Sequence, residues 1–431
     1  MKTIVLLFSI LISLISCDNY AVLVAGSHTY TNYRHQSDVF HFYQILKSRG
    51  IKPENIIVFA YDDIAYAKKN PFPGQIFNSP KGVNVYDGVV IDYYADDVTP
   101  ENYLAVLEGD ADAINAKDPR TTKKVLATTE EDNVFLYFSD HGSDGLISFP
   151  NKYLYADELF AALNIMYEKK MYKELVFYVE ACYSGSLFRN ILPANMSIYT
   201  TTAANHEESS YAEYCSYDAK VNDTLIGSCL GDEYSCRVME DIDSRPGDKL
   251  KEYTMQQQYE YLVKAVKESH VMQFGDLEIA EKSIFEFINE KAKKVANVLS
   301  GVADFILPSI EEEEEESHYK ISNENYRLEW FRMQAEQTND LSAEEEYYEE
   351  ILQEGRSTKI FQLFKKKFNL PKRNFDDEID YDCYRKVVEA YSDKCGMLID
   401  RDFKFMTHIA NFCTMGINSN KAISAFAEIC G

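Results

Sequence analysis

The chain has 431 residues, of which 46% are hydrophobic and 13% aromatic, so it is long enough for two domains and apolar enough for a folded core. Its formal net charge of -26 argues against a nucleic-acid-binding role, because phosphate binding needs a basic face. The same charge argues against adsorption to a membrane through basic patches.

The N-terminus has the layout of a cleaved signal peptide. Lys2 precedes an apolar run over residues 4–15, and a polar segment starts at Asp18. The run is too short to span a bilayer, and no later stretch is apolar enough for a transmembrane helix. A buried N-terminal strand and a lipoprotein-type cleavage site at residues 14–17 are the alternatives. We predict a signal peptide over residues 1–17 and a mature protein in an oxidising lumen or outside the cell.

Residues 19 to about 290 alternate short apolar runs with amphipathic segments. β-branched and aromatic residues predict strands at 20–25, 56–60, 134–139, 175–181 and 198–202. Apolar residues at helical spacing predict helices at 35–47 and 156–169. The alternation indicates an α/β domain, residues 18–290, with a mostly parallel sheet and helices on both faces.

Two of the predicted strands run directly into residues that carry chemistry. One ends at Ser139-Asp140-His141-Gly142, and the other at Glu180-Ala181-Cys182. Strand ends of a parallel sheet can lie side by side, and a thiol near an imidazole is an activated nucleophile. Gly142 lets the backbone approach a substrate, and its amide and that of Cys182 can hold an oxyanion. By spacing alone, a packed cysteine and a structural histidine remain the commoner interpretation.

Residues 291–339 include six consecutive glutamates, which repel one another and stay solvated. We predict an exposed acidic connector there, with a solvated helix as the alternative. Residues 340–431 are helical in period and predict a separate all-α domain. Its four cysteines favour two disulfides, while Cys215, Cys229 and Cys236 allow at most one pair among themselves. Asn195 and Asn222 begin glycosylation sequons.

The motifs of the α/β domain resemble those of the legumain (asparaginyl endopeptidase) family of caspase-like cysteine proteases, in the family's order over most of residues 19–275. The matching segments are residues 25–27, 32–36, 61–66, 97–100, 139–143, 180–182, 201–205 and 208–212. The resemblance implies a caspase-like fold and a lysosomal, vacuolar or secreted enzyme. It also implies Cys182 as nucleophile, His141 as general acid and Asn32 as the residue that orients the imidazole.

The resemblance also implies a pocket for asparagine. An asparagine side chain offers one acceptor and two donors, so a selective pocket needs donors and acceptors on opposite walls. Arg34 matches the donor, Glu180 and Asp232 match an acidic wall, and Ser210 lies alongside. Protonated aspartate should enter as the pH falls. Tyr183 stands where the family often carries an acidic residue, which changes the surroundings of the thiol.

At the C-terminus the cysteine spacing resembles that of the legumain prodomain, which implies the pairs Cys383–Cys413 and Cys395–Cys430. The full chain is then expected to be a latent zymogen whose own C-terminal domain inhibits it until acid releases it. Asn339, ahead of Asn323 and Asn325, is the expected self-cleavage site. A basic cluster is expected to dock on the acidic catalytic face, and consists of Lys365, Lys366, Lys367, Lys372 and Arg373.

The expected partners are peptides and proteins with exposed asparagine, and cystatin-type inhibitors. No cofactor and no metal are expected. A peptide asparaginyl ligase and a glycosylphosphatidylinositol-transamidase-like enzyme are the rival enzymes. An inactive binding homologue would be expected to lack Cys182 or His141, and both are present.

Overall fold

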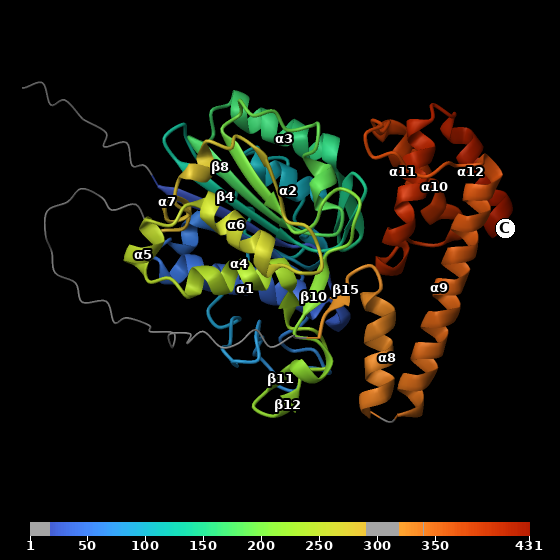
Figure 1. Ribbon diagram of the computed structural model, residues 1–431, viewed down its shortest axis with the longest axis horizontal. Coiled ribbons are helices and arrows are strands. Elements are labelled where there is room, and N and C mark those ends of the chain that lie inside the picture. The colour runs from blue at the N-terminus through green and yellow to red at the C-terminus, as the bar shows by residue number, and fades with distance from the viewer. Residues whose placement is uncertain (1–17, 290–318, 339) are drawn as a thin grey trace, which may run out of the picture.

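The computed structural model describes residues 18–289, 319–338 and 340–431. The predicted signal peptide, the glutamate run of the connector and Asn339 lie outside these residues. The described part forms an α/β body with a set of helices, α8 to α12, beside it (Figure 1).

A central sheet of seven strands, in the order β14-β9-β8-β4-β1-β2-β3, forms the middle of the α/β body. Its neighbours pair in parallel except at the edge, where β14 is antiparallel to β9. The strands are β1 Asn19–Ala25, β2 Ile56–Ala60, β3 Tyr93–Tyr94, β4 Asn133–Ser139, β8 Glu174–Glu180, β9 Ile198–Thr202 and β14 Met272–Gly275. The five predicted strands are confirmed, whereas β3 and β14 are too short for a period-2 pattern to reveal them.

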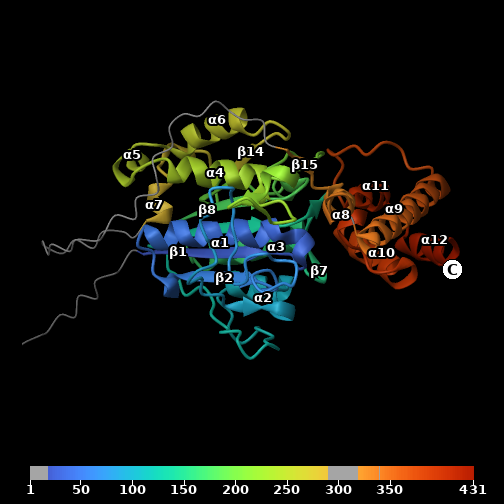
Figure 2. The same cartoon turned by 90° about the horizontal axis from the view of Figure 1, so that it is seen from below.

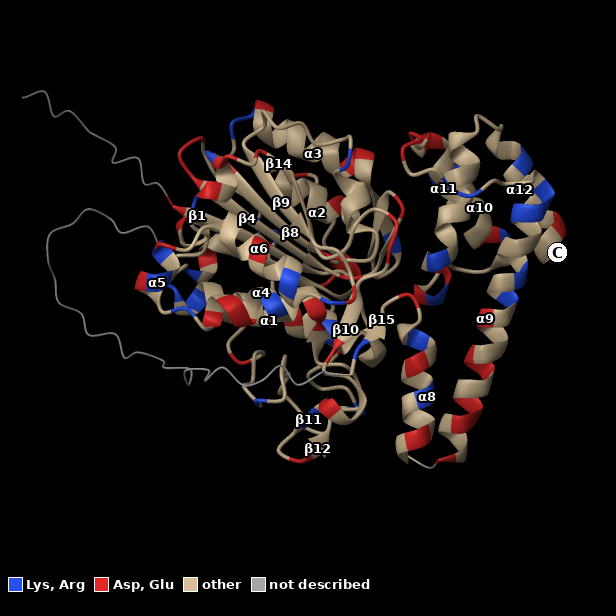
Figure 3. Cartoon of the chain, viewed as in Figure 1, with Lys and Arg blue, Asp and Glu red and all other residues tan. Residues whose placement is uncertain are grey.

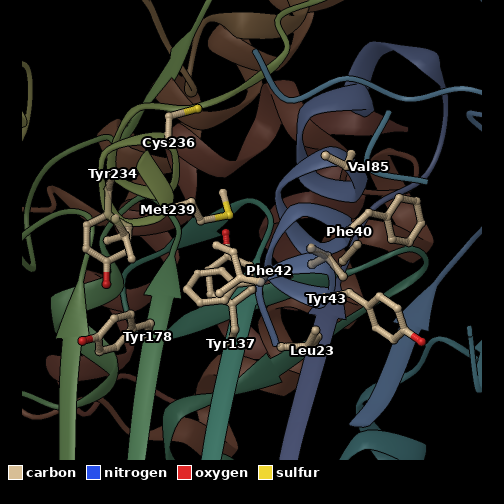
Figure 4. Close-up of a cluster of buried hydrophobic side chains, with 14 of the residues drawn as sticks. Leu23, Phe40, Phe42, Tyr43, Val85, Tyr137, Tyr178, Tyr234, Cys236 and Met239 are labelled. Atoms are coloured by element: carbon tan, nitrogen blue, oxygen red, sulfur yellow. The ribbon is translucent and has the colours of Figure 1, made fainter. Parts of the chain in front are cut away.

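Helices cover both faces of this sheet, as the alternation predicted (Figure 2). Side chains of β1 alternate between two cores, with Leu23 in one and Val22 in the other. In the core of Figure 4, Phe42 packs on Tyr137 with ring centroids 4.5 Å apart. The helices of the α/β body are α1 Tyr33–Ser48, α2 Pro100–Leu107, α3 Ala156–Glu168, α4 Glu233–Asp243, α5 Gly247–Lys251, α6 Met255–Ala265 and α7 Phe285–Ile288.

Three small antiparallel sheets flank the central one. Their strands are β5 Gly142–Ser143, β6 Leu146–Phe149 and β7 Lys152–Tyr155; β10 Tyr211–Glu213, β13 Gly231–Asp232 and β15 Ile321–Ser322; and β11 Lys220–Val221 with β12 Thr224–Leu225. A disulfide joins Cys215 to Cys229, and Cys236 is a buried free thiol.

The last part of the chain is an all-α domain, as predicted. Its helices are α9 Leu341–Phe368, α10 Tyr381–Cys395, the short η7 Asp400–Phe405, α11 Met406–Thr414 and α12 Ser419–Cys430. Disulfides Cys383–Cys413 and Cys395–Cys430 link these helices in the pairing that the resemblance implied. Within the described ranges, no helix combines the length and the apolarity needed to cross a membrane.

The predicted exposed connector needs a correction over residues 319–338. There the chain forms β15, which adds to the edge of β10, and the helix α8 Tyr326–Thr338. Tyr326, Trp330 and Met333 are buried at helical spacing and belong to the same core as the central sheet. The sequence contains this helical spacing, but the neighbouring run of glutamates favours an exposed segment, and the prediction followed the glutamates.

Candidate active site

Cys182 and His141 follow two neighbouring strands, at the carboxyl end of the central sheet. β4 and β8 are parallel partners, with Ser139 opposite Glu180, and each of the two residues follows two positions after this pair. The amide of Asp140 also donates to the carbonyl oxygen of Glu180 at 3.1 Å, which extends the pairing beyond the strands. The topology therefore brings the imidazole and the thiol to one site.

Asn32, at the start of α1, holds the imidazole of His141. Its Oδ1 lies 2.9 Å from Nε2 of His141, and its Nδ2 donates to the carbonyl oxygen of His28 at 3.1 Å. The second bond orients the amide so that its oxygen faces the ring. Nε2 then carries the proton, which leaves Nδ1 as the nitrogen able to accept one.

Gly142 lies where the backbones of the loops that carry His141 and Cys182 meet. A Cβ atom at this position would stand 2.5 Å from the carbonyl oxygen of Cys182 and 3.0 Å from Cβ of Ala181. Any larger residue would push the two loops apart. The glycine predicted from the sequence is therefore required by close packing between the histidine and cysteine loops.

The thiol and the imidazole are both neutral in this arrangement at neutral pH. Burial raises the pKa of Cys182 to about 12, and the carboxylate of Glu324 adds to this effect. Burial lowers the pKa of His141 to about 4, although the nearby Asp400 carboxylate opposes the shift. Sγ of Cys182 instead lies 3.2 Å from Oγ of Ser209 and accepts from the amide of Ser210 at 3.4 Å. A thiolate-imidazolium pair is disfavoured while the site is covered.

Arg34 and Asp232, two of the residues predicted to line a pocket for asparagine, form a fully buried ion pair. Nε of Arg34 donates to Oδ1 of Asp232 at 3.0 Å, and the guanidinium stacks on Tyr326 at 3.9 Å. Nη2 of Arg34 is buried and lacks a hydrogen-bond partner among the described residues. Glu180 accepts from the amide and hydroxyl of Ser235 instead of from Arg34. Burial, together with the charge of Asp232, raises the pKa of Glu180.

A residue of the chain itself, Asn323, bonds to two of the predicted pocket residues, Ser210 and Asp232. Its Nδ2 donates to Oγ of Ser210 at 2.9 Å and to Oδ1 of Asp232 at 2.8 Å. Its main-chain amide donates to the carbonyl oxygen of Ser210 at 2.9 Å. Its side-chain Oδ1 is buried without a hydrogen-bond partner in the described part. Of the three predicted processing asparagines, Asn323 lies at the site, Asn325 is exposed and accepts from Lys404, and Asn339 is not described. The sequon residues Asn195 and Asn222 are exposed.

The sequence reasoning missed a buried histidine next to this site. Nδ1 of His35 lies 2.7 Å from Oγ of Ser27 and 3.1 Å from Oδ1 of Asp140, and its Nε2 lies 3.5 Å from Asp232. Burial lowers the pKa of His35, and the charge of Arg34 adds to this. His35, Asp140 and His141 have potential ligand atoms within 4.8 Å of one another, but hydrogen bonds already engage both rings. The segment 32–36 contained the only sequence signal for His35.

The C-terminal helical domain covers the site with both apolar and charged contacts. Phe403 stacks on the ring of His141 with centroids 5.8 Å apart, and Tyr155 contacts Tyr384. Oδ2 of Asp400 lies 3.8 Å from Nε2 of His141. Both partners in the ion pair between Arg373 and Asp144, at 2.7 Å, are less than 10% exposed.

The predicted docking of the basic cluster needs a correction. Arg373 makes the ion pair just described, but Lys365, Lys366 and Lys367 are exposed, and Lys367 pairs with Glu428 of its own domain. These lysines lie on the solvent side of α9 because Phe361 and Phe364, on its other side, face the core of the C-terminal domain. Figure 3 shows that α9 changes from acidic at its start to basic at its end. Away from the cluster, Arg385 pairs with Asp157 of the α/β body at 2.9 Å.

Two family models match the chain. The model of the peptidase C13 family matches residues 19–297, and the model of the legumain prodomain matches residues 368–430. The first match ends near the last helix of the α/β body, and the second covers the disulfide-linked helices.

Several known proteins are similar to this chain. Legumain of Mus musculus is 35% identical over 428 residues, which cover 96% of this chain and 92% of that protein. The hemoglobinase of Schistosoma mansoni is 36% identical and covers the same shares of both chains. Legumain of Homo sapiens is 46% identical over 275 residues, which cover 64% of this chain and 60% of that protein. A crystal structure of caspase-1 from Spodoptera frugiperda aligns with a TM-score of 0.35 at 10% identity, over 60% of this chain and 87% of that one.

Proposed function

Because the chain belongs to the peptidase C13 family and carries a legumain prodomain, it is the zymogen of a cysteine-type endopeptidase, and we propose that this enzyme cuts peptide bonds after asparagine. In this proposal the site formed by Cys182, His141 and the Arg34 pocket carries out the reaction. The prodomain keeps the enzyme latent until acid loosens it.

The position of Asn323 is the observation that carries the proposed specificity. The Nδ2 group of Asn323 donates to Ser210 and to Asp232. Nη2 of Arg34 has no hydrogen-bond partner among the described residues, and in this proposal it donates to the side-chain oxygen of a substrate asparagine. An ionised aspartate would place a second acceptor against Asp232, so it should enter only when protonated. This arrangement supports cleavage after asparagine at all working pH values, and cleavage after aspartate only in acid.

The proposed mechanism follows from the geometry of the two strand ends. His141, oriented by Asn32, removes the proton of the Cys182 thiol through Nδ1, and the thiolate attacks the main-chain carbonyl carbon of the bound asparagine. The amides of Gly142 and Cys182 stabilise the oxyanion. The imidazolium then protonates the leaving amine, and water hydrolyses the thioester.

We further propose that Asn323 is the self-cleavage site, in place of Asn339. Asn323 lies in the pocket beside Cys182, and Glu324, the next residue, raises the pKa of the thiol and accepts from Oη of Tyr183 at 2.7 Å. Asn323 therefore bonds to Ser210, whose amide donates to the thiol, and Glu324 bonds to Tyr183, the residue after Cys182. While the prodomain covers the site, the high pKa of the thiol keeps it protonated, so self-cleavage should be slow. Release of the prodomain should make self-cleavage faster.

The remaining assignments extend the sequence predictions. We propose entry into the secretory pathway by a signal peptide of residues 1–17, glycosylation at the exposed Asn195 and Asn222, and residence in an acidic compartment or secretion. Domain boundaries at 290 and 340 remain proposals. Cystatin-type proteins are proposed inhibitors of the uncovered cleft.

A ligase remains the second candidate, because an amine can replace water at the thioester. The decisive test incubates acid-processed protein with asparaginyl, aspartyl and glutaminyl reporter peptides, with and without a second peptide that offers a free amine. Cleavage after asparagine, absent in Cys182→Ser, is the expected result. A dominant transpeptidation product would favour the ligase, and turnover without preference for asparagine would overturn the proposed specificity.

A further inference from the structure

Residues 320–323 lie along the site as an added strand. β15 pairs antiparallel with β10, with Ile321 opposite Ala212 and Ser322 opposite Tyr211. The amide of Asn323 donates to Ser210, and the carbonyl oxygen of Tyr319 accepts from Cys215 at 3.3 Å. Main-chain bonds of this kind hold any sequence, so selectivity must come from the side chains that the strand presents.

Each of these four side chains meets a different surface. Asn323 fills the Arg34 pocket, and Oγ of Ser322 donates to Oγ of Ser209 at 2.9 Å. Ile321 is buried in the core. The remaining residue, Lys320, lies three positions before Asn323 and meets two buried carboxylates.

Lys320 pairs with Glu233 and lies near Glu213. Its Nζ is 2.6 Å from Oε1 of Glu233 and 4.0 Å from Oε1 of Glu213, and its side chain is 13% exposed. Neither glutamate is more than 1% exposed. A cation of this length therefore reaches carboxylates that water barely touches, where an ion pair is stronger than on an open surface.

The Glu233 carboxylate is held by the fold independently of Lys320. Oε1 accepts from the amide of Lys267 at 2.8 Å, and Oε2 accepts from the amide of Glu268 at 3.4 Å. These bonds fix its position before a ligand arrives, so little order is lost when a cation binds.

The second carboxylate plays a smaller part in acid. Glu213 pairs with Arg237, which also binds Glu240 at 3.0 Å. Burial raises the pKa of Glu213 to about 8, although Arg237 and Lys320 oppose the shift. Glu213 is therefore mostly protonated in acid, where its carboxyl group lines the subsite as a neutral group.

We infer that Glu233, with Glu213 beside it, forms a specificity subsite that selects lysine or arginine three residues before the asparagine that is cut. The inference rests on the proposed function, because it takes residues 320–323 as a bound substrate segment. It narrows the preferred substrates to peptides with a basic residue, two intervening residues and then asparagine. The connector itself, with Lys320 and Asn323, has this pattern.

The test uses enzyme processed in acid from the full chain and peptides that differ only at the position of Lys320. Lysine, norleucine, alanine and glutamate are placed before Ile-Ser-Asn. Norleucine has nearly the same length as lysine without its charge, so the comparison isolates the ion pair. We expect kcat/KM to be about tenfold higher for lysine than for norleucine, and lowest for glutamate. Equal values for lysine and norleucine would overturn the inference.

Variants then assign the effect to the subsite. Glu233→Gln keeps the shape and one carbonyl acceptor, and should reduce the lysine-to-norleucine ratio to about one. Glu260→Gln, at an exposed position on α6, is the matched control and should keep the ratio. If Glu233→Gln keeps the ratio, Glu233 is not the selecting residue. If the enzyme cleaves after asparagine but kcat/KM does not depend on the residue three positions before it, only this inference is wrong. If the enzyme does not cleave after asparagine, the proposed function is wrong.

Discussion

Oδ2 of Asp400 lies 3.8 Å from Nε2 of His141, so a carboxylate of the prodomain faces the proposed catalytic imidazole. The same oxygen is 3.4 Å from Nδ2 of Asn32. Burial opposes the charge on Asp400, but His141 and Arg327 hold its pKa at about 2. Docking of the prodomain is therefore coupled to the protonation state of the site.

The first prediction concerns release by acid. Burial under the prodomain lowers the pKa of His141 to about 4 from an ordinary 6.5, so between these values the uncovered enzyme binds a proton more readily than the covered one. Lowering the pH through this window therefore weakens docking. A Cys182→Ser protein, cut at a protease site engineered between α8 and α9, should separate into two polypeptides with a midpoint between pH 4 and 6.5 by size-exclusion chromatography.

The control for acid release removes the titrating ring. His141→Phe in the same protein can still stack on Phe403, and should shift the midpoint to lower pH. Asp144 acts in the opposite direction, because burial raises its pKa in spite of Arg373 and docking then favours its protonation. If the two polypeptides separate in high salt at neutral pH, and His141→Phe leaves the midpoint pH of release unchanged, the result would instead support the predicted docking through ion pairs.

The proposed catalytic pair, Cys182 and His141, gives the second prediction. Cys182→Ser and His141→Ala should each lower kcat/KM by about a thousandfold or more, since both groups act on the reacting atoms. Thermal unfolding of the uncut proteins should stay close to that of the parent chain. Turnover near the parent value in either variant removes that residue from the mechanism.

The third prediction concerns Arg34. Arg34 is fully buried against Asp232 and Tyr326, so its substitution should affect both recognition and folding. Arg34→Lys keeps the charge and loses the fork and the stacking, so we expect kcat/KM for asparaginyl peptides to fall by about a hundredfold, together with a loss of about 1–3 kcal/mol in the free energy of unfolding.

A matched variant separates the two effects of Arg34→Lys. Arg245 also pairs with an aspartate and stacks on a tyrosine, at 3.6 Å, outside the site. Arg245→Lys should change stability without changing substrate preference. An asparagine preference that survives Arg34→Lys would exclude Arg34 from the pocket.

The fourth prediction concerns self-processing. Asn323→Ala should abolish the fragment that ends at residue 323 in acid-treated protein, measured by mass spectrometry, because the pocket then holds no amide. Asn325→Ala and Asn339→Ala should leave that fragment in place. A fragment that ends at residue 339, present in Asn323→Ala and absent in Asn339→Ala, would instead support the site first expected from the sequence.

Long strands and the residues that directly follow them were predictable from the sequence. The runs that became β4 and β8 are apolar enough to be recognised, and parallel pairing makes the positions of His141 and Cys182 follow from their strand ends. The prodomain disulfides followed from a resemblance in spacing. β3, β13 and β15 have two residues each, so their pairing depends on partners distant in the sequence.

The sequence by itself determined the chemistry that this chain can offer: a thiol, an imidazole, an asparagine and an arginine, each next to a strand or helix that local pattern identifies. Only the tertiary structure decided what faces them. Asn323 reaches Asp232 across 91 positions, and Asp400 reaches Asn32 across 368. Such contacts leave no periodic trace, because they depend on how separate elements pack. Local pattern and the family resemblance therefore indicated the candidate catalytic residues, whereas packing decided which asparagine reaches Asp232 and which carboxylate faces the histidine.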